Sequence, residues 1–106
     1  MIINILGTNY EIIKDSSGEN PKLEDCDGYC ETYSKKIVVE EKFKNSSNLV
    51  ENLDEYKKEV LRHEIIHAFF HESGMSLSRD LEERITEYIA AQIPKIWAVM
   101  REVDCL

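Results

Sequence analysis

Two histidines and a glutamate in this chain have the spacing of a metal site. His63, Glu64 and His67 form an H-E-x-x-H motif inside a segment whose apolar residues favour a helix. Residues four apart on an α-helix lie one above the other, so both imidazoles can bind one metal ion while Glu64 lies beside it. This pattern is typical of zinc-dependent hydrolysis, with Glu64 as general base and a zinc-bound water as nucleophile. We therefore expect one zinc ion and a peptide or protein substrate.

A catalytic zinc ion usually has three protein ligands, so a third must come from elsewhere in the chain. Chain reversal at Gly74 can return any of four later carboxylates to the motif: Asp80, Glu82, Glu83 and Glu87. His71 is a poor third ligand, because eight residues of helix separate it from His63 by about 12 Å. We expect His71 to line the cleft or to cap the helix end.

The motif needs a long helix to hold it. Asn52 followed by Glu55 is a plausible capping pair, and Gly74 is a natural stop, so the helix should run from there to about Glu72. On this helix His63, Glu64 and His67 lie in one stripe. The neighbouring stripe is apolar and should pack on a sheet; it contains Leu61, Ile65, Ala68 and Phe69.

A second helix is expected from near Asp80 to Val103, since its apolar residues recur at helical spacing. Asp80 as its N-cap would make Glu83 a capping-box residue, which is the structural alternative to metal binding. Pro94 should kink or break the helix, because proline removes a backbone donor.

The first forty residues favour strands. We expect strands at 2–6 and 10–13 around a turn at 7–9, then a loop at 15–25, then strands at 28–33 and 35–41. A polar loop at 44–48 leads into the motif helix. The sequence thus predicts one α+β domain over residues 1–106, with a small antiparallel or mixed sheet of three or four strands followed by two helices.

Charge and composition exclude several function classes. The chain has 106 residues and a formal net charge of −8, which opposes binding to nucleic acid or to anionic membranes. The segment before Gly7 is too short for a signal peptide, so we expect a cytoplasmic protein. Three cysteines, Cys26, Cys30 and Cys105, favour reduced thiols over disulfides, and the spacing of the first two is not a common zinc spacing.

Two segments resemble a known family. Residues 62–74, RHEIIHAFFHESG, and 81–94, LEERITEYIAAQIP, are similar to small, largely uncharacterised bacterial and phage-encoded metallopeptidase-like proteins of the zincin type. In the gluzincin branch of zincins, the second helix carries N-E-x-x-x-D, whose glutamate is the third zinc ligand. That motif corresponds to residues 82–87 here, with Glu82 in place of Asn and Glu87 in place of Asp. The resemblance covers only the C-terminal half.

The resemblance implies a minimal zincin-like fold and a role for several residues. Glu83 would be the third ligand and Glu87 the acid that orients a zinc-bound histidine, although the longer Glu87 can also reach the metal, so both stay open. His71 and Tyr88 are the candidates for stabilising the oxyanion. An extended peptide would pair with an exposed sheet edge, for which the strand at 37–41 is the candidate.

A second function competes with hydrolysis. A catalytically silent, zinc-binding interaction module, such as a phage or mobile-element accessory protein, would suit a chain with little room for substrate subsites. Glu64 favours the hydrolase, because a structural zinc site prefers four closed ligands and has no use for a neighbouring base.

Overall fold

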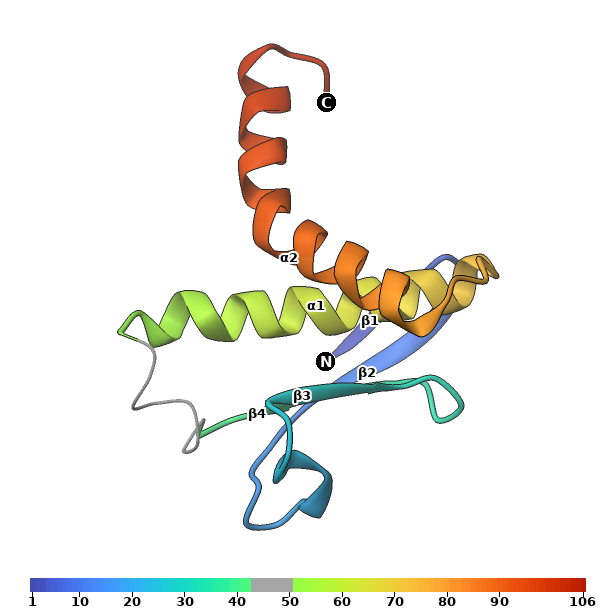
Figure 1. Ribbon diagram of the computed structural model, residues 1–106, viewed down its shortest axis with the longest axis vertical. Helices are drawn as coiled ribbons and strands as arrows, with labels where there is room; N and C mark the ends of the chain where they lie inside the picture. Colours follow the sequence, from blue (N-terminus) through green and yellow to red (C-terminus); the bar gives the residue numbers. More distant parts are fainter. Residues whose placement is uncertain (43–50) are drawn as a thin grey trace.

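The fold is a mixed sheet covered by one long helix, against which a second helix packs. The computed structural model describes residues 1–42 and 51–106, so the loop expected at 44–48 lies outside the described residues. Its elements are β1 (Ile2–Ile5), β2 (Thr8–Asp15), the short 3-10 helix η1 (Pro21–Leu23), β3 (Gly28–Glu31), β4 (Lys36–Glu40), α1 (Leu53–Ser73) and α2 (Arg79–Glu102). Figure 1 shows α1 lying along one face of the sheet and the first half of α2 crossing α1, and this four-stranded sheet followed by two helices confirms the α+β class.

The strand order decides which edge of the sheet is open. The order is β1-β2-β4-β3, with β2 and β4 parallel and the two outer pairs antiparallel. The expectation that residues 37–41 form an exposed edge is therefore wrong, because β4 is hydrogen-bonded on both sides. Its run Ile37, Val38 and Val39 is almost completely buried, as a central strand requires. The described edges are β1 and β3.

The first hairpin turns earlier than the sequence pattern predicts. Leu6 and Gly7 both have positive φ values, 50° and 95°, and these two residues alone connect β1 to β2. Two-residue hairpin turns with positive φ at both positions match the twist of the flanking strands. Asn4 Oδ1 accepts the Gly7 N–H at 3.0 Å and stabilises this turn. Thr8 and Asn9 consequently belong to β2 and not to the turn.

The core lies between α1 and one face of the sheet. Ile5, Tyr10, Ile37, Val39 and Ala68 form a buried cluster with exposures of at most 6%. Ala68 is the contact point of the helix, where a small side chain lets α1 approach the strands closely. The core therefore fixes the position of α1 at Ala68, the residue that directly follows the H-E-x-x-H motif.

Glu72, in the last turn of α1, ties the helix to the sheet. Its carboxylate accepts hydrogen bonds from Thr8 Oγ1 at 2.8 Å and Tyr10 Oη at 2.6 Å, and pairs with Lys35 Nζ at 2.9 Å. The bond from Tyr10, followed by those from Lys35 and Thr8, lowers the pKa of Glu72 from 4.5 to about 2. The charged form of Glu72 therefore stabilises the folded state.

We expect Glu72→Gln to lower the thermal unfolding midpoint by several degrees at pH 7. Because the folded-state pKa is depressed, the carboxylate contributes fully above pH 4.5 and loses its contribution as the pH falls towards about 2. The gap between wild type and variant should therefore shrink over that interval when melting is followed by circular dichroism. Glu11→Gln, at an exposed position on β2, is the matched control. A gap that stays constant down to pH 2 would contradict this role.

The helix caps are partly as expected. Asn52 accepts the Glu55 N–H at 3.3 Å, and Gly74 closes α1 with a φ of 74°. The N-cap of α2 is Ser78, whose Oγ accepts the Leu81 N–H at 3.3 Å, so the expectation of Asp80 as the cap is wrong. Glu83 is consequently not in a capping-box position, and that alternative role for it is removed.

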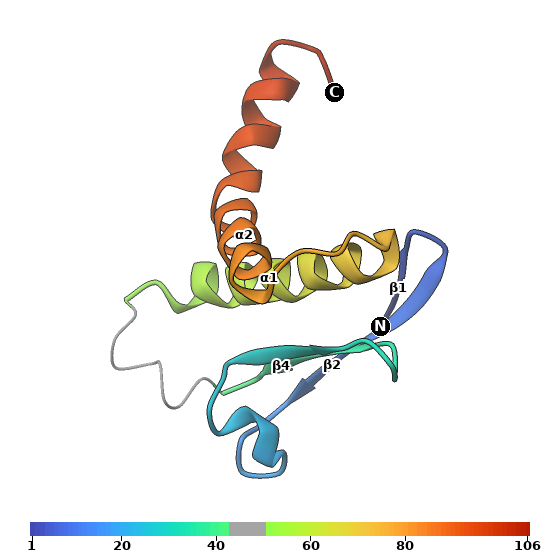
Figure 2. The same cartoon turned by 45° about the vertical axis from the view of Figure 1, so that its right-hand side comes forward.

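α2 bends at its middle. Pro94 lies within the helix, and Figure 2 shows the first half crossing α1 while the second half turns away from the molecule. The expected kink is confirmed, since proline removes one helical hydrogen bond without ending the helix. Over the described residues, neither helix is apolar enough over sufficient length to span a bilayer.

Candidate metal centre

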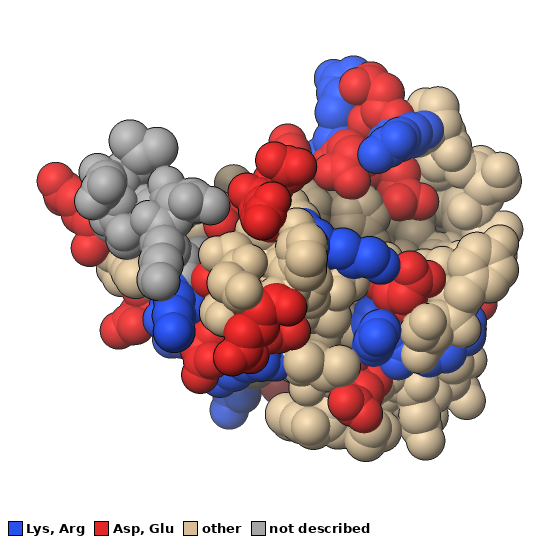
Figure 3. Space-filling model, turned by 90° about the horizontal axis from the view of Figure 1, so that it is seen from below, with Lys and Arg blue, Asp and Glu red and all other residues tan. Residues whose placement is uncertain are grey.

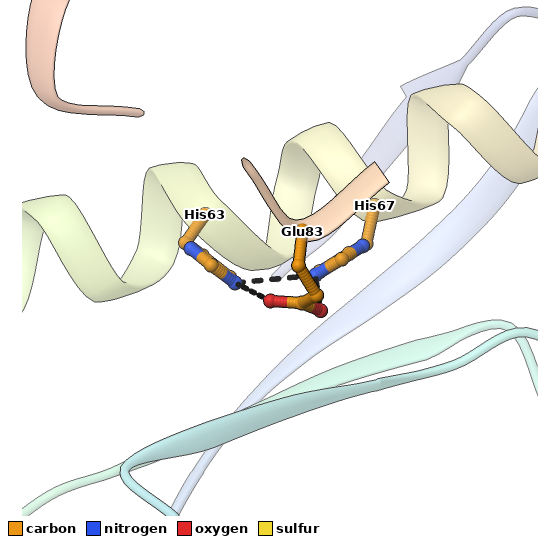
Figure 4. Close-up of side chains that lie close together, drawn as sticks. All are labelled: His63, His67 and Glu83. Atoms are coloured by element: carbon orange, nitrogen blue, oxygen red, sulfur yellow. Dashed lines mark hydrogen bonds and ion pairs between the residues drawn. The ribbon is translucent and has the colours of Figure 1, made fainter. Parts of the chain in front are cut away.

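Side chains from both helices converge at the H-E-x-x-H motif. His63 Nε2 and His67 Nε2, one turn apart on α1, lie 3.1 Å from each other. Glu83 from α2 brings its Oε1 to 2.8 Å from His67 Nε2 and its Oε2 to 3.4 Å from His63 Nε2. Figure 4 shows the three side chains pointing toward one another. Chain reversal at Gly74 thus returns one of the four candidate carboxylates to the two histidines.

The geometry of this cluster fits a small divalent cation. Ligands arranged tetrahedrally about zinc, at bond lengths of about 2.0–2.2 Å, lie about 3.3 Å from one another. The nearest separations are 2.8, 3.1 and 3.4 Å and involve both oxygens of Glu83, and with one ligand atom from each residue the three atoms lie within 4.8 Å of one another. Two imidazoles and a carboxylate are also a common donor set for catalytic zinc. Among the described residues, His63, His67 and Glu83 form the one group suited to hold a metal ion.

The burial of His63 favours the protonation state that metal binding needs. Burial, followed by the neighbouring charge of His67, lowers the pKa of His63, which favours the neutral imidazole that metals require. A cation bound by both Nε2 atoms and the Glu83 carboxylate would take the place of the protons that these atoms can otherwise share.

Glu82 holds the ring of His67 in place. Its Oε2 lies 2.8 Å from His67 Nδ1, so a proton on Nδ1 is donated to this carboxylate and Nε2 is directed to the cluster. The resemblance implies such an orienting role for Glu87, whereas Glu82 is expected from the sequence only as one of four possible ligands. Spacing along α2 does not distinguish Glu82 from Glu87, because it does not show how the chain reversal after α1 orients α2 relative to His67.

We expect Glu82→Ala to weaken zinc affinity by about 10–100-fold, which is typical for a partner that orients a metal ligand. Competition with a chromophoric chelator measures this loss. Glu87→Ala on the same helix is the matched control and should change the affinity much less. A larger loss of zinc affinity in Glu87→Ala than in Glu82→Ala would mean that Glu87, and not Glu82, orients the histidine.

Four other residues considered from the sequence lie outside the three-residue cluster. Glu87 is exposed and lines a hollow next to His63 and Glu64, without joining the three-residue cluster. Asp80 is exposed in the first turn of α2. His71 lines the same cavity as the cluster, whereas Tyr88 is 64% exposed and does not line it. Of the two oxyanion candidates, His71 is therefore the better placed.

A cavity of about 860 Å³ lies over the cluster, between the helices and β3. Its walls include Gly28, Tyr29 and Cys30 from β3 and residues 74–77 after α1. β3 is an edge strand of the described sheet, so one side of this cavity is formed by a strand whose outer edge pairs with none of the other described strands. The cavity has the size of a typical ligand site.

Glu64 lies in the wall between α1 and β3, beside the cluster. It is 7% exposed, and burial, offset by the charge of His67 and reinforced by that of Glu83, raises its pKa from 4.5 to about 7. Gly28 makes this approach possible: a Cβ there would lie 3.1 Å from Val60 Cγ1 and 3.4 Å from Glu64 Cγ. The sequence gives no sign of this role for Gly28, because the contact joins residues far apart in the chain.

The cysteines do not belong to the metal cluster. Cys26 and Cys30 line the cavity, and all three cysteines are free, as expected for reduced thiols. Burial raises the pKa of both cavity thiols, that of Cys30 to about 12. Protonated thiols are poor metal ligands.

Comparisons with protein-family models, with curated proteins and with solved structures find no match to this chain. The interpretation of the cluster therefore depends on its own geometry and on the residues of the two helices.

Proposed function

We propose that this protein is a zinc-dependent hydrolase that cleaves peptide bonds, with a site of gluzincin type. One observation carries the proposal: two imidazole nitrogens and a carboxylate converge at metal-binding distances, with a buried carboxylate beside them that is not part of the cluster. A purely structural metal site has no need of such a base. His63, His67 and Glu83 would hold the ion.

Each residue then has a defined task. When bound, zinc would acidify a water molecule towards neutral pH and polarise the substrate carbonyl. Glu64 accepts the proton of the attacking water and later gives it to the leaving amine. Glu82 keeps His67 in its metal-binding orientation. His71, on the cavity wall, is the candidate donor to the developing oxyanion.

The open edge of β3 suggests how a peptide would bind. An extended peptide can pair with an edge strand through its backbone, which orients it without regard to sequence. β3 borders the cavity, so a peptide added to this edge would pass over the cluster. We thus give β3 the role that the resemblance implied for residues 37–41.

The charge around the cluster favours a basic side chain in the substrate. A hollow of about 340 Å³ adjoins His63 and Glu64 and contains three further carboxylates, those of Asp27, Glu59 and Glu87. Asp27 accepts a hydrogen bond from Tyr56. Acidic side chains also gather at several places on the face seen in Figure 3, in agreement with the net charge of −8. A lysine or arginine next to the cleaved bond would complement this hollow.

A peptide library that includes basic residues at every position tests the proposal. Cleavage by zinc-loaded wild type, its loss with a chelator and its return with added zinc would support a metallopeptidase. Zinc-loaded wild type that cleaves no peptide would instead support the interaction module. Fragments separated by mass spectrometry also report whether cleavage occurs beside lysine or arginine.

A further inference from the structure

The second half of α2 continues into an arm with many exposed apolar side chains, which does not pack on the rest of the described residues. We call residues 95–106 the arm. Figures 1 and 2 both show it projecting from the body of the molecule, and every residue from 93 to 106 is exposed. Its large apolar side chains are 39–68% exposed: Ile96, Trp97, Val99, Met100, Val103 and Leu106. A small protein rarely leaves so many contiguous apolar groups in water unless they bind something.

The middle of α2, which includes the first half of the arm, has the composition of an interface core, whereas the end of the arm adds Arg101, Glu102 and Asp104. Between Ile89 and Met100 the one charged residue is Lys95, although 32% of the whole chain is charged. This stretch also contains Trp97, the one tryptophan of the chain. Interface cores are depleted in charge and enriched in tryptophan and methionine.

An apolar groove continues from the base of the arm. It has a volume of about 490 Å³ and lies between α1 and α2, where Phe69 and Phe70 face Ile89 and Ile93. Phe69, expected on the sheet side of α1, is instead 43% exposed in this groove. Ile89 and Ile93 are followed at helical spacing by Ile96 or Trp97 and by Met100. Groove and arm therefore form one continuous apolar surface.

We propose that this surface is a homodimer interface, in which the arm of one copy packs along the groove and arm of a second copy. If a second copy covered both the exposed apolar residues of the arm and the groove, the buried area would be on the order of the 800 Å² per partner of a standard interface. Because one chain carries both a projecting arm and a groove to receive it, two copies related by a two-fold axis satisfy both surfaces at once.

Charges on the arm favour an antiparallel second copy over an unrelated partner. Lys95 lies at the start of the arm, whereas Arg101, Glu102 and Asp104 near its end together carry a net charge of −1, so two antiparallel arms set opposite net charges against each other. Arg62, which borders the groove, already donates through Nε to Ala90 O at 2.7 Å. None of the three metal-ligand candidates lines the groove, so dimer formation leaves the cluster accessible.

Light scattering coupled to size exclusion, and sedimentation across a concentration series, test this proposal on the full chain. Wild type should be a dimer, whereas Trp97→Glu and Phe69→Glu should each weaken self-association by at least about 100-fold. Tyr33→Glu, at a 92% exposed aromatic away from the arm, is the matched control and should remain dimeric. Circular dichroism checks that each variant stays folded.

Tryptophan fluorescence gives an independent measurement on the unaltered protein. Since Trp97 is the one tryptophan, its emission should shift to shorter wavelength as dilute protein is concentrated and the arm is buried. A wild type that stays monomeric at high concentration would overturn the proposal. A dimer that both glutamate variants leave intact would also overturn it. Neither outcome depends on zinc binding or hydrolysis.

Discussion

Replacing His67 with alanine should reduce bound zinc from one ion per chain to a substoichiometric amount. His67 Nε2 lies within 3.1 Å of His63 Nε2 and 2.8 Å of Glu83 Oε1, so its loss opens the cluster and also leaves Glu82 without a partner. The affinity should fall by more than about 100-fold, beyond the loss typical of an orienting residue. Metal analysis after dialysis, together with a chelator competition, measures both quantities.

His71→Ala is the matched control for that experiment. It removes the same ring from the same helix, one turn further on, and should retain one zinc per chain because His71 lies outside the cluster. Equal zinc loss in the two variants would mean that zinc binds elsewhere in the cavity. Full zinc retention in His67→Ala would mean that His67 is not a zinc ligand.

Replacing Glu64 with glutamine should separate metal binding from catalysis. Glutamine has nearly the same shape but cannot accept a proton, so the zinc content should stay at one per chain while kcat falls by about 10²–10⁴-fold. Peptide hydrolysis under saturating substrate measures the loss. Glu55→Gln, an exposed position in the first turn of α1, is the control and should keep full activity.

Two outcomes of the Glu64 experiment would count against the proposed role. Activity that survives in Glu64→Gln would require a different base or a contaminating peptidase. Zinc loss in Glu64→Gln would make Glu64 a ligand, and the cluster would then be a closed, structural site.

Local features of the fold follow from the sequence because they depend on neighbouring residues. The cap at Asn52, the stop at Gly74 and the kink at Pro94 each arise from the backbone chemistry of one residue, and all three were predicted correctly. The meeting of His63 with His67 likewise follows from the period of an α-helix. Such features need no knowledge of the tertiary fold.

Features that depend on long-range packing could not be predicted in the same way. The central position of β4 arises because β2 pairs with it, although residues 16–35 separate the two strands in the sequence. The amino-acid sequence of a buried strand does not show which strands are its neighbours. The roles of Glu82, Gly28 and Phe69 depend on how α2 and β3 approach α1. Spacing along one helix cannot distinguish which of several carboxylates faces a second helix.

The most direct test of the central claim is a crystal structure of the zinc-loaded protein with anomalous data collected on both sides of the zinc absorption edge. The expected result is one anomalous peak, bonded to Nε2 of His63, Nε2 of His67 and a carboxylate oxygen of Glu83, with Glu64 nearby but not bonded to the metal. A peak bonded to Glu64, or one that lies away from the two imidazoles, would contradict the account.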